Sequence, residues 1–295
     1  MAAALAHELK AATPGARWGQ ERRLEFIEFR LLWEGRINRS ELVDHFGISV
    51  PQASIDLSRY AELAPANLIY DKTAKAYVTG LQFVPVFDEA QSRRYLTQLG
   101  NLGAGLESAR QSFIGWRPES ALVRMPERNI DASVLATILR GIRAARQVRV
   151  SYQSLSQPDN STRSIEPHAL AHDGSRWHVR AWCAQRQAFR DFVLSRIQSA
   201  TLEGGRQVDP ATDTRWHQIV EIEIAPQAGL TPSQHAAVAH EYGMEGGLLR
   251  LPTRAAMLHY VVRHLQLDRP ITDPNAPPLI WRNRSKLAHH LLPNM

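Results

Sequence analysis

The sequence is poor in cysteine and in long apolar runs. Its 295 residues include one cysteine, Cys183, which excludes an internal disulfide and a metal site built on several thiolates. No apolar run approaches the ~18 residues of a membrane-spanning helix. His7 and Glu8 interrupt the N-terminal stretch where a signal peptide needs its apolar segment. These absences predict a cytoplasmic protein.

Motifs of catalysis and of metal binding are absent as well. The chain has no phosphate-binding loop of the GxxxxGK type, no GxSxG and no HExxH. Twelve histidines are present, but those near Cys183, which are His168, His172 and His178, fit no tight ligand spacing. We therefore expect neither an enzyme nor a bound metal or cofactor.

Lysine is scarce, with four residues against 31 arginines, and the net charge is +6. Residues 1–80 hold 10 basic and 10 acidic residues, residues 81–215 hold 18 and 13, and residues 216–295 hold 7 and 6. Arginine suits bidentate contacts to phosphate or base edges, although GC-rich coding sequence also raises its frequency. The excess charge thus points to an anionic partner of the middle region.

The length predicts two or three domains of a multidomain α+β protein. In residues 1–80, apolar spacing and capping signals predict three helices, one ending at Gly35 and the others spanning Asn38–Gly47 and Ser49–Leu63. Two short strands, Leu68–Tyr70 and Ala76–Val78, follow. Three helices and a hairpin predict a winged helix-turn-helix DNA-binding domain.

The third helix is the expected DNA reader. Ala53, Leu57 and Tyr60 share the face that should pack inward, while the opposite face offers Ile55 for a thymine methyl group. Each of two residues has an alternative role that stays open. Gln52 could cap the helix together with Ser49 instead of contacting a base, and Ile55 could be buried under a neighbouring segment. The candidate DNA contacts are Arg36, Arg39, Ser49, Gln52, Ser54, Ile55, Arg59, Lys72 and Lys75. Because residues 1–80 are electrically neutral, a dimer is expected to supply enough contacts.

The rest of the chain divides into three further regions. Residues 81–130 are expected to form a helical linker, with a helix over 88–109 and a connection over 115–130. In residues 131–210 a leading helix is followed by short alternating strands, which are typical of a small barrel. Residues 216–295 alternate strand and helix and predict a small α+β module.

One strand of the barrel carries unusual side chains. In Trp177–Cys183, alternation places His178, Arg180 and Trp182 on the face opposite the expected core residues, which are Trp177, Val179, Ala181 and Cys183. Residues 176–196 contain five arginines and one acid, Asp191, a surplus that suits an anionic ligand. The alternative is an arginine and aspartate network that only stabilises the barrel.

These residues carry a resemblance to a family. Ser151-Tyr152, Arg163, Pro167-His168, the strand Trp177–Ala181 and Arg190-x-Phe192…Arg196-Ile197 resemble the WYL domain, with Trp177-His178-Val179 in place of its Trp-Tyr-Leu triplet. That replacement, together with Ser58-Arg59-Tyr60, Leu63-Ala64-Pro65 and Tyr70-Asp71-Lys72, resembles the BrxR/CapW group of transcriptional regulators associated with phage defence.

The resemblance implies a homodimeric repressor of a phage-defence or related operon, bound to an inverted-repeat operator. It also implies an Sm/SH3-like barrel that senses a nucleotide-like or nucleic-acid ligand, and C-terminal dimerisation through residues 216–295. By position, the ligand site comprises Ser151, Tyr152, Ser154, Arg163, His168, His178, Arg180, Arg190 and Arg196. A competing hypothesis is an accessory protein that grips single-stranded nucleic acid without operator specificity.

Overall fold

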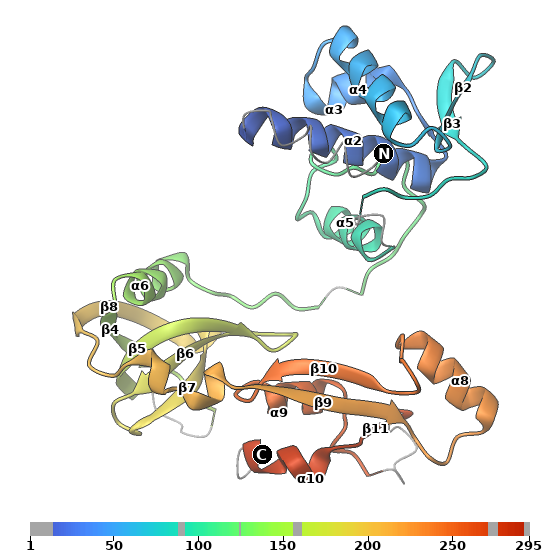
Figure 1. Ribbon diagram of the computed structural model, residues 1–295. Coiled ribbons are helices and arrows are strands. Elements are labelled where there is room, and N and C mark those ends of the chain that lie inside the picture. Colours follow the sequence, from blue (N-terminus) through green and yellow to red (C-terminus); the bar gives the residue numbers. More distant parts are fainter. Residues whose placement is uncertain (1–13, 88–91, 124, 156–160, 271–276, 292–295) are drawn as a thin grey trace. The chain divides into compact units, whose positions relative to one another are not determined.

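The computed structural model describes residues 14–87, 92–123, 125–155, 161–270 and 277–291. The chain divides into two compact units, Met1–Pro126 and Glu127–Met295, each with its own apolar core (Figure 1). Within the described residues, no helix is long and apolar enough to cross a membrane.

The first unit is a winged helix-turn-helix, as predicted. Its elements are α2 (Pro14–Glu34), β1 (Arg36–Ile37), α3 (Arg39–Phe46), α4 (Val50–Leu63), β2 (Leu68–Asp71), β3 (Ala76–Thr79) and α5 (Ser92–Ala104). The short strand β1 was not foreseen, and it completes an antiparallel sheet of order β1-β3-β2. Gly47 ends α3 in the left-handed region, with φ of 66°, and so allows the tight turn into α4.

The core of this unit joins α2 to α3 and α4. Leu24, Ile27 and Leu31 of α2 are buried against Leu42 and Leu57. A buried carboxylate, Glu28, accepts hydrogen bonds from the Tyr60 hydroxyl and from the backbone N–H groups of residues 86 and 87. The start of the linker is therefore fixed to the winged helix by hydrogen bonds. Helix α5 ends at Ala104, before the expected end near 109, and the described part of residues 105–130 contains no further helix, as expected for the connection over 115–130.

The second unit begins with α6 (Ala132–Arg143), which the Asp131 side chain caps. Five strands follow in the order β7-β6-β5-β4-β8: β4 (Arg146–Tyr152), β5 (Ser161–His172), β6 (Trp177–Cys183), β7 (Ala188–Val193) and β8 (Ile197–Gly205). Helix α6 packs against β4, β5 and β8. Gly141 permits this close approach, because a Cβ atom there would lie 2.6 Å from Val148 Cγ2.

The expected closed barrel, including its Sm/SH3-like form, is not confirmed. Strands β7 and β8 are the two edges of an open sheet, and they do not pair with each other in the described part of the chain. A bulge at His168 bends the long strand β5 between its partners β4 and β6. The short helix η2 (Leu194–Arg196) connects the edge strand β7 to the other edge strand, β8, without backbone hydrogen bonds between the two strands.

The C-terminal part of the second unit is a small α+β module, as predicted. It contains η3 (Pro210–Thr212), α7 (Thr214–His217), β9 (Ile219–Pro226), α8 (Pro232–Glu241), β10 (Leu249–Arg254), α9 (Leu258–His264), β11 (Leu279–Trp281), α10 (Arg284–Leu287) and η4 (Ala288–His290). Its antiparallel sheet has the order β10-β9-β11. The core lies between this sheet and α9, around Ile222, Ile224 and Leu258.

Candidate DNA-binding face and ligand-sensing sheet

Helix α4 has the buried and exposed faces that the sequence predicts. Ala53, Leu57 and Tyr60 are fully buried, whereas Ile55 on the opposite face is 56% exposed. No described segment of this unit covers Ile55. An isoleucine left in water on such a helix is placed to contact a thymine methyl group in the major groove.

The polar residues of α4 make local hydrogen bonds. Ser49 caps the helix, since its Oγ accepts from the Gln52 N–H at 3.3 Å. The Gln52 side chain does not complete the capping box; its Nε2 donates to Asp56 Oδ1 at 3.1 Å. Ser54 Oγ donates to the Val50 carbonyl at 3.0 Å. Bonds from Gln52 and Ser54 to base edges would replace these local bonds.

Asp56 is a structural residue that the sequence reasoning missed. Its side chain is fully buried, and Arg23 of α2 binds it with Nε–Oδ2 at 2.6 Å and Nη2–Oδ1 at 3.2 Å. Asp56 therefore fixes the orientation of α4 against α2. Its position three residues after Ala53 and four before Tyr60, on the inward face, is the signal that could have revealed it.

The candidate phosphate contacts surround α4 and the wing. Arg36, Arg39, Lys72 and Lys75 are exposed, and the half-buried Arg59 is ion-paired with Glu62. Arg36 lies on β1 opposite Val78 of the wing strand β3. At the wing tip, the Asp71 carboxylate accepts from the N–H groups of residues 73 and 74, which shapes the turn that carries the two lysines. Helix α4 thus carries an exposed apolar side chain, and exposed cations lie on β1, α3 and the turn between β2 and β3; Figure 1 shows these elements.

The nine predicted ligand residues fall into two groups. The first lies around Tyr152, which packs edge-on against Phe192 with ring centroids 5.3 Å apart. The Arg163 guanidinium stacks on both rings, at 5.4 Å from Tyr152 and 5.9 Å from Phe192. Arg196 is nearby in η2, where its carbonyl accepts from the Gln153 N–H at 3.0 Å.

The remaining members of the first group occupy strand ends and edges. Arg190 is exposed on the edge strand β7, while Ser151 and Ser154 are half-buried at the end of β4 and just after it. Strand alternation places Ser151 on the face opposite Tyr152. Within the described part of the chain, neither the Arg190 nor the Arg196 guanidinium has an ion-pair partner. This group therefore has exposed or half-buried cations around two aromatic rings that are themselves buried in the core of the sheet.

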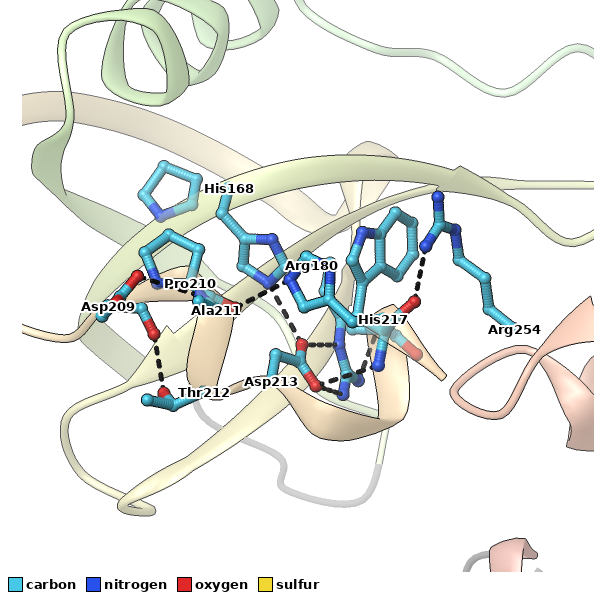
Figure 2. Close-up of polar contacts among 12 residues, drawn as sticks. His168, Arg180, Asp209, Pro210, Ala211, Thr212, Asp213, His217 and Arg254 are labelled. Atoms are coloured by element: carbon cyan, nitrogen blue, oxygen red, sulfur yellow. Dashed lines mark hydrogen bonds and ion pairs between the residues drawn. The ribbon is translucent and has the colours of Figure 1, made fainter. Parts of the chain in front are cut away.

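The second group, His168, His178 and Arg180, is bound to carboxylates. Arg180 donates to Asp213 through Nε at 2.7 Å and Nη2 at 2.9 Å, and to Asp191 through Nη1 at 3.2 Å. His168 Nε2 lies 3.1 Å from Asp213 Oδ2, so both side chains converge on one carboxylate (Figure 2). These contacts match the alternative interpretation from the sequence, in which arginine and aspartate side chains form a network that stabilises the fold.

His178 makes the third of these contacts. Its Nε2 lies 2.9 Å from Asp173 Oδ2, and its ring packs against Tyr260 of α9 with centroids 5.0 Å apart. The sequence reasoning missed Asp213 and Tyr260, because they come from the connection and the module that follow the sheet.

Burial and hydrogen bonding act in opposite directions on these carboxyl groups. Burial raises the pKa of Asp213, but hydrogen bonds from His168 and Arg180 prevail and hold that pKa well below its ordinary value. The pKa of Asp173 is likewise low, because bonds from His178 and from two backbone N–H groups outweigh its burial. Burial lowers the pKa of Arg180 and its two aspartates raise it, with a net increase. Asp213, Asp173 and Arg180 are therefore charged at neutral pH.

Stability should fall on acidification because of a nearby histidine. Burial lowers the pKa of His259 on α9 to about 4, whereas the unfolded chain takes up the proton near pH ~6.5. The folded state is thus penalised as pH falls from about 6.5 to about 4, by roughly 3 kcal/mol at the lower end. In His259→Gln, we expect the pH dependence of the unfolding free energy over this range to be flatter.

Urea unfolding between pH 7 and pH 4.5 measures this effect. His240→Gln, the same change at an exposed position of α8, is the matched control and should keep the wild-type slope. Equal slopes in wild type and His259→Gln would contradict the assignment.

Three family descriptions match the chain in sequence order. Residues 19–101 match the BrxR transcriptional regulator winged helix-turn-helix domain, residues 133–202 the WYL domain, and residues 219–287 the BrxR transcriptional regulator C-terminal dimerization domain. Fold and site together define a winged-helix regulator of transcription with a WYL domain.

The chain belongs to the family of the DNA-binding transcriptional repressor CapW. It is 43% identical over 275 residues to the CapW of Pseudomonas aeruginosa, with 92% of each chain covered. Identity to the CapW of Stenotrophomonas maltophilia is 45% over 255 residues, with 85% of each chain covered. The CapW of Escherichia coli (strain KTE188) is 43% identical over 275 residues, again with 92% coverage of both.

These relatives are named as repressors and not as enzymes, which agrees with the prediction that the chain is not an enzyme. A solved structure of proteasome accessory factor B/C of Arthrobacter aurescens is 18% identical and covers 92% of this chain and 47% of its own. Its TM-score is 0.26, too low for a shared overall arrangement, so the family assignment rests on the sequence relatives.

Proposed function

We propose that this protein represses transcription as a homodimer on an inverted-repeat operator, with α4 in the major groove and the wing on the flanking backbone. The observation that carries the proposal is the exposed Ile55 on a capped helix bordered by cationic side chains. The match of residues 219–287 to a dimerization domain and the repressor names of the relatives support it. Such a repressor acts in the cytoplasm, where its operator is.

We propose further that a nucleotide-like or nucleic-acid ligand regulates the repressor at the first group of sheet residues. Arg163, Arg190 and Arg196 would meet its phosphates. Ser154, beside them, would add a hydroxyl contact. That the controlled operon serves phage defence is supported by the resemblance to the BrxR/CapW group.

Salt dependence tests the cationic contacts. A dimer that uses all five candidate cations of each protomer should lose affinity for operator DNA steeply, with a log-log slope of about −9. In Lys72→Ala/Lys75→Ala, the slope should become shallower by roughly 3 to 4, because four contacts of the dimer are removed. Gel-shift titrations at several salt concentrations on the promoter fragment upstream of the gene measure it.

Lys286→Ala on α10 is the matched control, because it removes an exposed lysine far along the chain from the winged helix. It should leave the slope unchanged. Equal slopes in wild type and in the wing variant would remove the wing from the interface.

Arg196→Ala tests the ligand site. We expect this variant to bind operator within about twofold of wild type, but to lose the effect of an added single-stranded oligonucleotide or nucleoside monophosphate on operator binding. Arg186→Ala, an exposed arginine on the turn between β6 and β7, is the control and should respond as wild type. Unchanged responses in Arg196→Ala would remove the ligand site.

One observation supports the alternative function, a single-strand-binding accessory protein: the sheet contains both cationic and aromatic residues. It predicts tighter binding to single strands than to duplex and equal affinity for operator and scrambled duplex. A direct comparison of these three DNA molecules separates the two functions.

A further inference from the structure

Four buried residues join the WYL sheet to the C-terminal module. Arg180 of β6 and Asp191 of β7 face each other across adjacent strands. Asp213 comes from the turn between η3 and α7, and Tyr260 comes from α9. We call these four residues the Arg180 bridge.

Asp213 is the first connection in the bridge. One carboxylate accepts the two Arg180 bonds and also caps α7, through the Trp216 N–H at 3.3 Å. Helix α7 is in turn bound to the C-terminal module, because the Arg215 carbonyl accepts from the Ala256 N–H at 2.8 Å. Arg254 also donates to the Trp216 carbonyl and stacks on its indole ring (Figure 2). A continuous series of contacts therefore connects Arg180 on the sheet, through Asp213 and α7, to the start of β9.

Tyr260 is the second connection. Its hydroxyl donates to Asp191 Oδ2 at 3.2 Å, while the other oxygen of Asp191 accepts from Arg180. The side chains of Arg180, Asp191 and Asp213 are exposed by only 6%, 8% and 2%. The module is therefore held at two points, and both converge on one arginine.

A buried network of charged side chains adds little to the free energy of folding, but it defines how the elements that carry those side chains are oriented. Taking charges out of water offsets most of the attraction between them, whereas one fixed set of partners permits one arrangement of the elements. Three of the five Arg180 N–H groups are bound to Asp213 and Asp191, and the side chain is only 6% exposed, so little of the guanidinium is accessible to a ligand phosphate.

We propose that Arg180 is a positioning residue and not a ligand contact. It sets the orientation of the dimerisation module on the WYL sheet through Asp213 and through Asp191 and Tyr260, and a change in this orientation is expected to alter the half-site spacing that the dimer prefers. This inference rests on the proposed operator binding by a homodimer.

Tyr260→Phe tests the bridge with little risk to folding, because it removes one hydroxyl and leaves the ion pairs of the sheet intact. The wild-type dimer should prefer the natural half-site spacing over spacings changed by two base pairs by at least about tenfold. In Tyr260→Phe, this preference should fall to within about threefold, while affinity for a single half-site stays unchanged. Tyr242→Phe, the same change at the end of α8, should keep the wild-type preference.

Hydrogen exchange provides a second readout that does not depend on DNA. In Tyr260→Phe, amides of α7 and α9 should exchange about tenfold faster, and those of β4 and β5 should not change. If both the exchange rates and the spacing preference match wild type, the proposal is overturned. If wild type itself shows no operator preference, the proposed function fails, and the exchange rates alone decide whether the bridge holds the module.

Discussion

Replacing Asp56 by alanine is expected to lower the free energy of unfolding of the winged-helix unit by about 3–5 kcal/mol. The substitution leaves the Arg23 guanidinium, which is 16% exposed, without its carboxylate, and it removes the acceptor of the Gln52 amide. A domain is stable by only about 5–15 kcal/mol, so much of this unit would be unfolded and repression would be lost. Native-state hydrogen exchange of α2 and α4 amides measures the change.

Asp44→Ala on α3 is the matched control for Asp56→Ala. Asp44 is exposed, so the same chemical change should alter stability by less than about 0.5 kcal/mol. The double variant Arg23→Met/Asp56→Leu removes both charges together and should recover most of the lost stability. An effect of Asp56→Ala as small as that of Asp44→Ala would show that the pair does not hold α4 in place.

Ile55→Glu is expected to weaken operator binding by at least about 100-fold. It removes an apolar base contact and places a negative charge where α4 should face the phosphates and base edges of the major groove. Because Ile55 is 56% exposed, the unfolding free energy should change little. Ile55→Ala, which removes only the apolar contact, should cost about tenfold.

The matched control for Ile55→Glu is Leu96→Glu. Leu96 is also an exposed apolar residue on a helix of the same unit, but it lies on α5, away from α4 and the wing. The affinity of the Leu96→Glu variant for operator DNA should stay within about threefold of wild type, as measured by gel shift. Equal losses in the two variants would show a general effect of charge and would remove α4 as the DNA reader.

Local signals in the sequence predicted most of the winged helix. The Ser49 cap, the Gly47 stop and the inward spacing of Ala53, Leu57 and Tyr60 depend on residues a few positions apart, and all are found in the structure. The Gln52 side chain differs, because its Nε2 donates to the buried Asp56 carboxylate instead of the side chain completing the capping box with Ser49.

The sheet was predicted less completely for a physical reason. Alternation correctly separated Val179 and Ala181, which are in the core, from His178 and Arg180 on the other face. Alternation says nothing about what covers that other face. The arginine surplus was therefore interpreted as a ligand site, with a network as the alternative, and strand spacing could not decide whether the edges β7 and β8 pair.

By itself, the sequence determined the order of the domains, the boundaries of most elements and the inward face of each, because these depend on neighbours within about one helical turn or two strand positions. The tertiary structure decided which charges are available to a partner. Arg196 and Arg180 lie on neighbouring elements of one sheet, yet Arg180 meets Asp213, 33 positions along the chain, while the Arg196 guanidinium has no ion-pair partner in the described part of the chain. Only folding brings a carboxylate from so far along the chain to one arginine and not to the other.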